Sequence, residues 1–316
     1  MTSITDVPGI RVGHATRTTD GWLSGVTVIL PPPGTIGSVD VRGGGPGTHE
    51  TDALDPTTLT SRIDAVVLTG GSAYGLVSAS GAQRWCEEDG RGFPVTGGVV
   101  PIVPAAAIFD LGRGGDFTAR PDLAMGYAAT AAAAAREDGH DVDRGNVGAG
   151  TGAVIGRGTY KGGVGTASIT LENGVVVGAL AVVNALGLPY RGFEKLDDQR
   201  QRVSAPPPLN TTLVVVATNA TLDKAECKRT ASAAHAGLAR ALNPSHTLAD
   251  GDTVFCLATG ALALDRSSDA ARQYSLITLQ SAAADVVRLA ILDGVASADA
   301  VDTPAGEFRA YGDDVR

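Results

Sequence analysis

The sequence contains few cysteines and few candidate metal ligands. Its three cysteines, Cys86, Cys227 and Cys256, lie far apart and form neither a C-x-x-C motif nor a metal-binding spacing. An odd number of such residues fits a reducing compartment, where cysteine serves as a small core residue. The five histidines show no H-x-x-x-H or H-E-x-x-H spacing, which argues against a zinc site. We therefore expect no metal and no cofactor.

Positive charge and long apolar runs are also scarce. Lys and Arg number 25 against 34 Asp and Glu, which gives a net charge of −9. A nucleic-acid partner would require a basic stripe, and none is visible. The first 20 residues lack the apolar segment of a secretory signal, and no run of about 18 apolar residues is present. We expect a cytoplasmic protein with neither a nucleic-acid nor a membrane partner.

Apolar residues and glycine are plentiful. Hydrophobic residues make up 43% of the 316-residue chain, enough for a core, and the 42 glycines cluster around loops and strands without a repeat. Hairpins and long helices occur without regular βαβ alternation, which favours an α+β layered sandwich over a doubly wound sheet. The expected strands cover 25–30, 36–42, 63–67, 163–170, 175–183, 213–218 and 253–259, and the expected helices cover 76–89, 122–137, 223–242 and 274–296. Pro101 and Pro104 make the apolar segment 99–108 an edge strand or a loop.

One junction carries a specific chemical possibility. Prolines 206–208 hold the chain extended and exclude a helix, and a β-branched run typical of a buried strand follows Asn210. A cut between Asn210 and Thr211 would free an N-terminal threonine. Its hydroxyl is a nucleophile, and its α-amine, with an ordinary pKa of about 7.7–8.0, is a base. The polar, proline-rich segment 189–210 is the best candidate for an exposed, cleavable stretch. The alternative is an ordinary linker that leads into a strand.

Two further motifs each allow two interpretations. Asp250 and Asp252 flank one glycine before an expected strand, and side-chain alternation places both carboxylates on one side, where they could orient a hydroxyl or an amine. The same Asp-Gly-Asp pattern is also a common turn. The motif Gly-Gly-Ser-Ala-Tyr-Gly at 70–75 could present N–H groups to an anion, or could serve only tight packing between a strand and a helix. It matches neither the phosphate-loop spacing nor the G-x-S-x-G nucleophile motif.

Two polar residues stand in apolar surroundings. Lys161 precedes two glycines in a strand-rich region, and Asn184 ends an apolar run. A polar side chain at the end of a buried run requires hydrogen-bond partners. Asn184 is therefore a candidate oxyanion donor, and Lys161 could hold a carboxylate or stabilise developing negative charge.

Together these segments resemble the DmpA-like peptidase family, which includes L-aminopeptidase/D-esterases, β-aminopeptidases and 6-aminohexanoate-oligomer (nylon) hydrolases. The similarity runs in order along nearly the whole chain. The segments that carry it are TDVPGIRVGH at 5–14, GGGPGTHETD at 43–52, LTGGSAYGL at 68–76, KGGVGTAS at 161–168 and NTTLVVVAT at 210–218.

The resemblance implies a fold and a processing event. The fold is a four-layer αββα sandwich of the N-terminal-nucleophile type, formed by a single domain over residues 1–316. The precursor would cut itself between Asn210 and Thr211 into an α chain, 1–210, and a β chain, 211–316. Some members have serine at the nucleophile position, so Thr211 resembles the nylon-hydrolase branch. Relatives assemble as tetramers of αβ units, which implies a homo-oligomer here.

The resemblance also implies catalytic roles. Thr211 would be the nucleophile, Asn184 the oxyanion donor and Lys161 the family's lysine, while Asp250 and Asp252 match the two aspartates beyond the threonine of the nylon hydrolases. Some relatives use a tyrosine as a further oxyanion donor. The candidates for contact with substrate in the 70–75 motif are Ser72 and Tyr74.

The expected function is that of a self-processing amidohydrolase or aminopeptidase. Its substrates would be small molecules or short peptides with a free amino terminus, such as amino-acid amides, β-peptides or 6-aminohexanoate oligomers. Two alternatives stay open at this point. One is an uncut, non-catalytic small-molecule-binding protein, and the other is an acyltransferase of the ornithine acetyltransferase type, which also cuts itself before a threonine.

Overall fold

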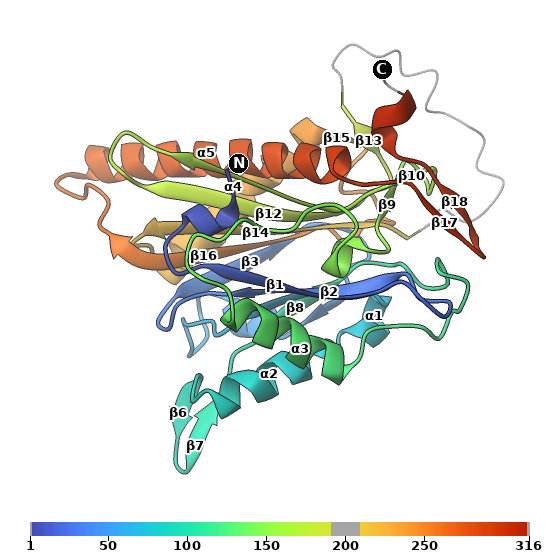
Figure 1. The fold of residues 1–316 in the computed structure, drawn as a ribbon. Coiled ribbons are helices and arrows are strands. Elements are labelled where there is room, and N and C mark those ends of the chain that lie inside the picture. The colour runs from blue at the N-terminus through green and yellow to red at the C-terminus, as the bar shows by residue number, and fades with distance from the viewer. Residues whose placement is uncertain (1, 191–208, 315–316) are drawn as a thin grey trace.

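The computed structural model describes residues 2–190 and 209–314, so most of the predicted cleavable segment 189–210 lies outside the described residues. Two five-stranded sheets face each other, and helices cover their outer faces (Figure 1). The first sheet has the order β1 (Arg11–Arg17), β2 (Ser24–Leu30), β5 (Val66–Thr69), β8 (Ala105–Ala107) and β4 (Thr48–His49). The second has the order β11 (Val164–Thr170), β12 (Val176–Asn184), β14 (Thr211–Ala220), β16 (Thr253–Leu262) and β3 (Ile36–Val41).

The helices form the two outer layers. α2 (Ser78–Glu88) and α3 (Leu123–Ala134) pack on the first sheet, α4 (Lys224–Ala241) and α5 (Asp269–Ala296) pack on the second, and α1 (Ser72–Gly75) is a single short turn. The remaining short elements are β6 (Phe93–Val95), β7 (Gly98–Val100), β9 (Val154–Ile155), β10 (Tyr160–Lys161), β13 (Leu188–Pro189), β15 (Leu242–Asn243), β17 (Val301–Thr303), β18 (Gly306–Phe308) and the 3₁₀ turns Ile4–Asp6, Asp52–Leu54, Gly148–Gly150 and Tyr311–Asp314. The prediction of an αββα sandwich is confirmed.

Side-chain alternation along β14 explains the layering. All ten residues of this strand are buried. Leu213 and Val215 point into the core between the two sheets, whereas Val214 and Val216 point into the core beneath α4 and α5. A strand covered on both faces reads as a continuous apolar run, which is why this segment was recognisable in the sequence.

Local signals set several element boundaries. The Asp122 side chain accepts the Met125 N–H and begins α3, and a capping box between Asp223 and Glu226 begins α4. Gly174, with a φ of +81°, lies in the hairpin turn between β11 and β12. These helices and this hairpin lie close to where the sequence places them.

The interpretation of 99–108 as an edge strand or a loop is wrong in part. β8 is an internal strand that pairs in parallel with β5 and antiparallel with β4. It is only three residues long, and both Pro101 and Pro104 lie before it, so no ladder hydrogen bond is lost to a proline. The neighbouring strand also begins later than expected, at Val66 and not at residue 63.

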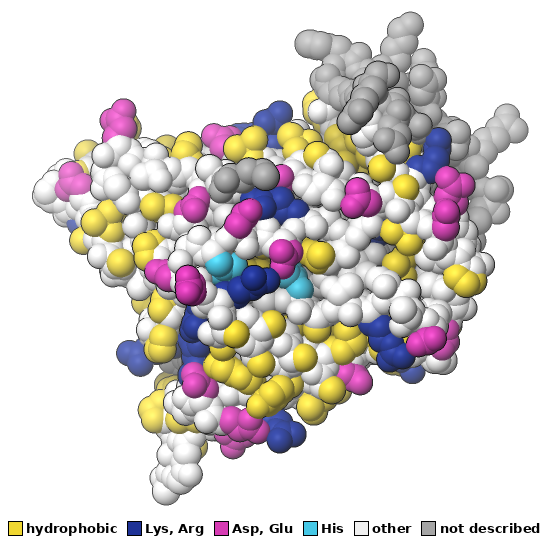
Figure 2. Space-filling model, viewed as in Figure 1, with side chains coloured by type: hydrophobic (Ala, Val, Ile, Leu, Met, Phe, Trp, Pro, Cys, Tyr) yellow, Lys and Arg dark blue, Asp and Glu magenta, His cyan; other side chains and the backbone are white. Residues whose placement is uncertain are grey.

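α5 is long and apolar enough to cross a membrane by length and composition alone. Core helices of globular proteins pass the same test. Here Leu279, Val286, Val287 and Ile291 of α5 are buried in the core that it forms with the second sheet and α4. On the face in Figure 2, acidic and basic side chains of the described residues are interspersed. The absence of membrane and nucleic-acid partners stays a prediction.

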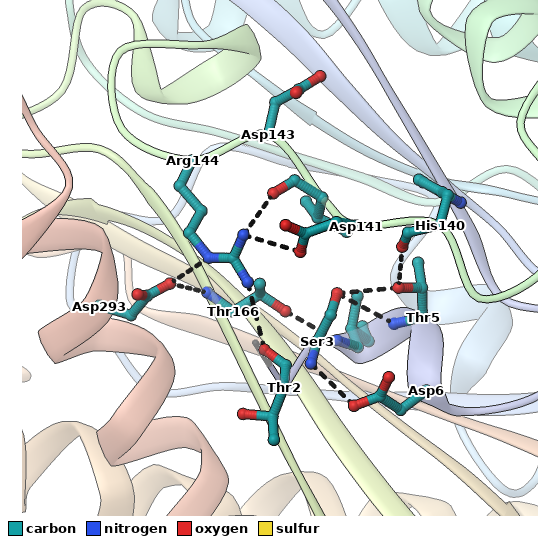
Figure 3. Close-up of polar contacts among 12 residues, drawn as sticks. Thr2, Ser3, Thr5, Asp6, His140, Asp141, Asp143, Arg144, Thr166 and Asp293 are labelled. Carbon is teal, nitrogen blue, oxygen red and sulfur yellow. Dashed lines mark hydrogen bonds and ion pairs between the residues drawn. The ribbon is translucent and has the colours of Figure 1, made fainter.

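The parts of the chain before and after residue 210 are interleaved. β14 and β16 lie between β12 and β3 in the second sheet, so strands from the later part are bounded on both sides by strands from the earlier part. Figure 3 shows a polar cluster that also joins the two parts. In it, Arg144 Nε donates to Asp293 Oδ2 of α5 at 3.0 Å, and the same oxygen accepts the Thr166 N–H at 2.9 Å.

Candidate active site

The predicted nucleophile lies at one end of the gap between the sheets. Thr211 is the first residue of β14, and alternation with Leu213 and Val215 turns its side chain toward the first sheet. Asn184 is the last residue of β12 and is paired directly with Thr211 across the antiparallel ladder. Directly opposed residues project to the same face, so the two side chains are neighbours. Only 4% of Thr211 and none of Asn184 is exposed.

The peptide bond before Thr211 is flanked by two donors. Thr211 Oγ1 donates to the Asn210 carbonyl oxygen at 2.5 Å, and the Gly251 N–H donates to the same oxygen at 2.9 Å. A Cβ atom at Gly251 would lie 2.6 Å from Thr211 Oγ1, closer than side-chain carbons approach other atoms. Because residue 251 is a glycine, its backbone can lie against both the Thr211 hydroxyl and the Asn210 carbonyl.

The two aspartates shape the loop that supplies this N–H. Asp252 Oδ1 accepts the Thr212 N–H at 2.7 Å, and Oδ2 accepts the backbone N–H and Nδ1 of His246 at 3.0 and 2.8 Å. Asp250 Oδ2 accepts the N–H and the hydroxyl of Thr247 at 2.7 and 2.6 Å, and burial raises the pKa of Asp250. Within the described residues neither carboxylate bonds to the side chain of Thr211. Asp250 thus closes the turn that begins at Thr247 and pairs with Asn210 in an isolated β-bridge, and Gly251 follows it on the way into β16.

Lys161 is fully buried beside Asn184. Its ammonium group donates to the carbonyl oxygens of Thr151 and Ala153 at 2.8 and 2.6 Å, and the next N–H, that of Val154, donates to Asn184 Oδ1 at 3.1 Å. Burial, with the charge of Arg113 acting in the same direction and Asp110 against it, lowers the pKa of Lys161 to about 7.

The structure adds two charged residues that the sequence reasoning missed, Asp110 and Arg113. Arg113 Nη1 donates to Asn184 Oδ1 and to the Gly152 carbonyl, both at 2.6 Å. The Asp110 carboxylate accepts the Ser24 hydroxyl at 2.8 Å and the Gly71 N–H at 2.6 Å. Burial lowers the pKa of Arg113 to about 10, while Asp110 opposes this shift, and burial raises the pKa of Asp110. The available signal was an aspartate directly after an apolar run that ends at Phe109, with an arginine three residues further on.

The 70–75 motif turns its N–H groups inward. Gly71 donates to Asp110, Ser72 donates to the Ile108 carbonyl, and a Cβ at Gly75 would meet the Gly70 carbonyl oxygen at 1.8 Å. This geometry favours the packing interpretation over anion binding. Tyr74 is 56% exposed, and its ring lies 3.9 Å from the Arg120 guanidinium carbon. Within the described residues no hydrogen bond joins the side chains of Ser72 or Tyr74 to Thr211, so their contact with substrate stays a prediction.

No ion site accompanies these residues in the described part of the chain. Among the side chains that the structure describes, over 2–190 and 209–312, no three from His, Cys, Asp or Glu lie close enough together to hold a metal ion. The site brings a hydroxyl and a backbone N–H donor to one carbonyl oxygen, that of Asn210. Lys161 and Arg113 bind the backbone carbonyls of 151–153, and Arg113 also binds the Asn184 side chain.

Comparison with known proteins identifies the family. Residues 2–309 match the model of peptidase family S58. An uncharacterized aminopeptidase of Mycobacterium tuberculosis is 49% identical and covers 95% of each chain. A 6-aminohexanoate-oligomer endohydrolase of a Kocuria species is 29% identical over 84% of this chain and 78% of its own.

Solved structures agree with these matches. A β-aminopeptidase from a Burkholderia species superposes with a TM-score of 0.76 at 25% identity, covering 99% of this chain and 91% of its own. The L-aminopeptidase D-Ala-esterase/amidase of Ochrobactrum anthropi, described as a variant of the Ntn hydrolase fold, gives the same TM-score at 24% identity over 98% and 90%. The resemblance read from the sequence is confirmed. The chain belongs to peptidase family S58 and is a hydrolase that acts on amide bonds.

Proposed function

We propose that this protein cuts itself between Asn210 and Thr211 and then uses the freed threonine to hydrolyse amide bonds of small substrates with a free amino terminus. The observation that carries the proposal is the placement of the Thr211 hydroxyl and the Gly251 N–H on one carbonyl oxygen, that of Asn210. In the proposed reaction these two groups would be the nucleophile and the oxyanion donor at the same peptide bond.

Self-cleavage would proceed as an N-to-O acyl shift. Thr211 Oγ1 attacks the Asn210 carbonyl carbon, the Gly251 N–H stabilises the negative charge on the oxygen, and the C–N bond breaks as the nitrogen of Thr211 takes up a proton. The resulting ester is hydrolysed by water. The products are the carboxylate of Asn210 and a threonine with both a free hydroxyl and a free amine.

Turnover of substrate would use the new amine as the base. It takes the proton of Thr211 Oγ1 as the oxygen attacks the substrate carbonyl, and it returns that proton to the leaving amine. The Asn184 side chain, across the ladder from Thr211, donates to the oxyanion. Water then hydrolyses the acyl ester. Lys161 acts by holding the 151–153 segment beside Asn184, and Asp250 and Asp252 act by holding the chain around Gly251 and Thr211.

The names of the relatives support this substrate class. Proteins at 49% identity are called aminopeptidases, and proteins at 28–29% are called 6-aminohexanoate-oligomer endohydrolases. A free amine is common to amino-acid amides, β-peptides and 6-aminohexanoate oligomers. A panel of α- and β-amino-acid p-nitroanilides, assayed beside 6-aminohexanoate oligomers, would select among them, and inactivity toward all of them would contradict the proposal.

The Thr211→Ala variant tests the self-cleavage step. Purified wild-type protein should give two fragments in an intact mass spectrum, and the smaller should begin Thr-Thr-Leu-Val. Thr211→Ala should give one species at 31.9 kDa because it lacks the hydroxyl. The adjacent Thr212→Ala variant is the matched control and should be cut as the wild type is. Two fragments from Thr211→Ala would refute the mechanism, and an uncut wild type would favour the binding-protein alternative.

The assembly of the protein is also a proposal. We expect a homo-oligomer of αβ units in the cytoplasm, and light scattering after size-exclusion chromatography would measure its mass. A particle of 31.9 kDa would contradict this expectation.

A further inference from the structure

The orientation of the Asn184 amide is fixed by its neighbours. Its Oδ1 atom faces two donors, Arg113 Nη1 at 2.6 Å and the Val154 N–H at 3.1 Å. A flipped amide would point its NH₂ group at both donors and would leave all three groups without acceptors. The oxygen is therefore on the side of Arg113, and the NH₂ group is turned away from it.

The NH₂ group of the Asn184 amide has an unused hydrogen-bonding capacity. Within the described residues, Asn184 Nδ2 makes only one hydrogen bond, a long one of 3.4 Å to the Phe109 carbonyl. Nδ2 carries two hydrogens, so one N–H remains for another acceptor. Asn184 and Thr211 are opposed on the same face of the sheet, so this N–H belongs to the region where a carbonyl attacked by Thr211 would lie.

Arg113 is held so that it can fix this orientation. The two hydrogens of its Nη1 atom are divided between Asn184 Oδ1 and the Gly152 carbonyl. Gly152 lies between the two carbonyls that bind the Lys161 ammonium group, so one loop is held by both cations. The Thr303 hydroxyl also donates to the Arg113 carbonyl at 2.7 Å, which ties the arginine to the part of the chain after residue 210.

We propose that Arg113 is a positioning residue for substrate hydrolysis, which orients the Asn184 amide so that its N–H group stabilises the oxyanion formed on the substrate. This inference rests on the proposed function and adds a residue to it. It also assigns different oxyanion donors to self-cleavage and to substrate hydrolysis. The Asn210 carbonyl is served by the Gly251 N–H, whereas the substrate carbonyl would be served by Asn184. Loss of Arg113 should therefore slow turnover and leave self-cleavage intact.

The experiment compares Arg113→Met, Arg113→Lys, Asn184→Ala and the Arg113→Met/Asn184→Ala double variant with the wild type. The matched control is Arg240→Met, which removes an arginine from an exposed ion pair with Asp285. Intact mass spectra report self-cleavage. Steady-state kinetics with an amino-acid p-nitroanilide that the wild type hydrolyses report kcat and KM separately.

The expected result is a specific loss of kcat. Arg113→Met should be cut like the wild type, with kcat roughly 10–100-fold lower and KM nearly unchanged, while Asn184→Ala should lose about 10²–10³-fold, as other oxyanion donors do. The double variant should fall within about twofold of Asn184→Ala, because an arginine that acts through Asn184 has no effect without it. Arg113→Lys, which keeps one donor group for Asn184 Oδ1, should recover part of kcat.

Several results would overturn the inference. One is a double variant whose loss of kcat equals the product of the two single losses. Another is an Arg113→Met kcat within about threefold of the wild type. A third is an Arg113→Met variant that folds but is not cut. If Arg113→Met does not fold, Arg113→Lys decides by the same comparison in the Asn184→Ala background. A wild type that is neither cut nor active refutes the proposed function itself. A wild type that is cut and active, with additive variants, refutes the role of Arg113 alone.

Discussion

Gly251→Ala adds one methyl group where the Thr211 hydroxyl meets the Asn210 carbonyl. The new Cβ atom would lie 2.6 Å from Thr211 Oγ1, 2.9 Å from the Gly45 carbonyl oxygen and 3.2 Å from Pro46 Cα. An ordinary contact begins at 3.4 Å, so the hydroxyl must retreat by about 0.8 Å or rotate away. Rotation about one side-chain bond is the least costly response for the fold, and it removes Oγ1 from the carbonyl that it would attack.

The expected effects on rate and on stability differ in size. A misplacement of about 1 Å in a reacting group costs on the order of 10²-fold in rate. Overpacking of a buried site costs about 1–3 kcal/mol, and the full range applies because the Thr211 side chain can rotate whereas the Gly45 carbonyl at 2.9 Å requires a backbone shift. Gly251→Ala should therefore remain folded, with its melting temperature lowered by a few degrees, and should cut itself at least about 100-fold more slowly than the wild type.

Cell-free synthesis followed by denaturing gels at fixed times would measure the fraction cut. The matched control is Gly98→Ala in β7, where an added Cβ atom has no neighbour within 4 Å. This control should be cut at the wild-type rate. If Gly251→Ala is cut within about threefold of that rate, the hydroxyl does not have to occupy the observed position, and the proposed cleavage geometry is wrong.

Two other substitutions test the surroundings of the nucleophile. Asp252→Asn replaces a carboxylate that accepts three N–H groups with an amide that has one acceptor atom, so we expect a loss of about 1–3 kcal/mol in the free energy of unfolding and slower self-cleavage. Thermal melts and the same gel assay measure both, and Asp285→Asn, in an exposed ion pair, is the control that should change neither. The second substitution, at His235, tests how stability depends on pH. Burial lowers the pKa of His235 from 6.5 to about 4, so between these pH values the unfolded chain binds a proton that the folded chain does not. Stability should therefore fall on acidification, by about 2 kcal/mol from pH 7 to pH 5 for this group. Urea titrations in the uncut Thr211→Ala background should show a smaller pH dependence for His235→Gln, and an unchanged dependence would contradict the buried, neutral state of His235.

The sequence predicts the strands and helices that carry strong local signals. The β-branched run after Asn210 becomes β14, and Asp122 and Asp223, where two helices were expected to begin, are the residues that cap them. Pro101 and Pro104 wrongly suggested that the segment of β8 is an edge strand or a loop. The three residues of β8 follow Pro104, so neither proline interrupts its pairing with the neighbouring strands. Local signals describe single segments, so they could not indicate that β8 is internal to its sheet.

The candidate site shows the same limit. No spacing rule connects Asn184 to Thr211; the resemblance to a family proposed it, and the β12–β14 ladder places the two side by side. Arg113 was not found because its partners, Gly152 and Asn184, lie 39 and 71 residues away along the chain. The aspartates were expected to act on an amine or a hydroxyl. The hydrogen bonds of their carboxylates go to Thr212, His246 and Thr247, so within the described residues they hold the chain around Thr211 and Gly251 and do not contact the Thr211 hydroxyl.

The placement of β14 and β16 between β12 and β3 determines when a cut can be made and what it can release. A chain that ended at Asn210 would have to form its second sheet with two central strands missing, and the bare edges of β12 and β3 would be open to pairing with other molecules. In the proposed self-cleavage, the uncut polypeptide would fold first and the cut would act on a finished sheet. Two polypeptides interleaved in this way would have no route to exchange subunits short of complete unfolding, so the proposed break would create a new chain end without creating a new binding equilibrium.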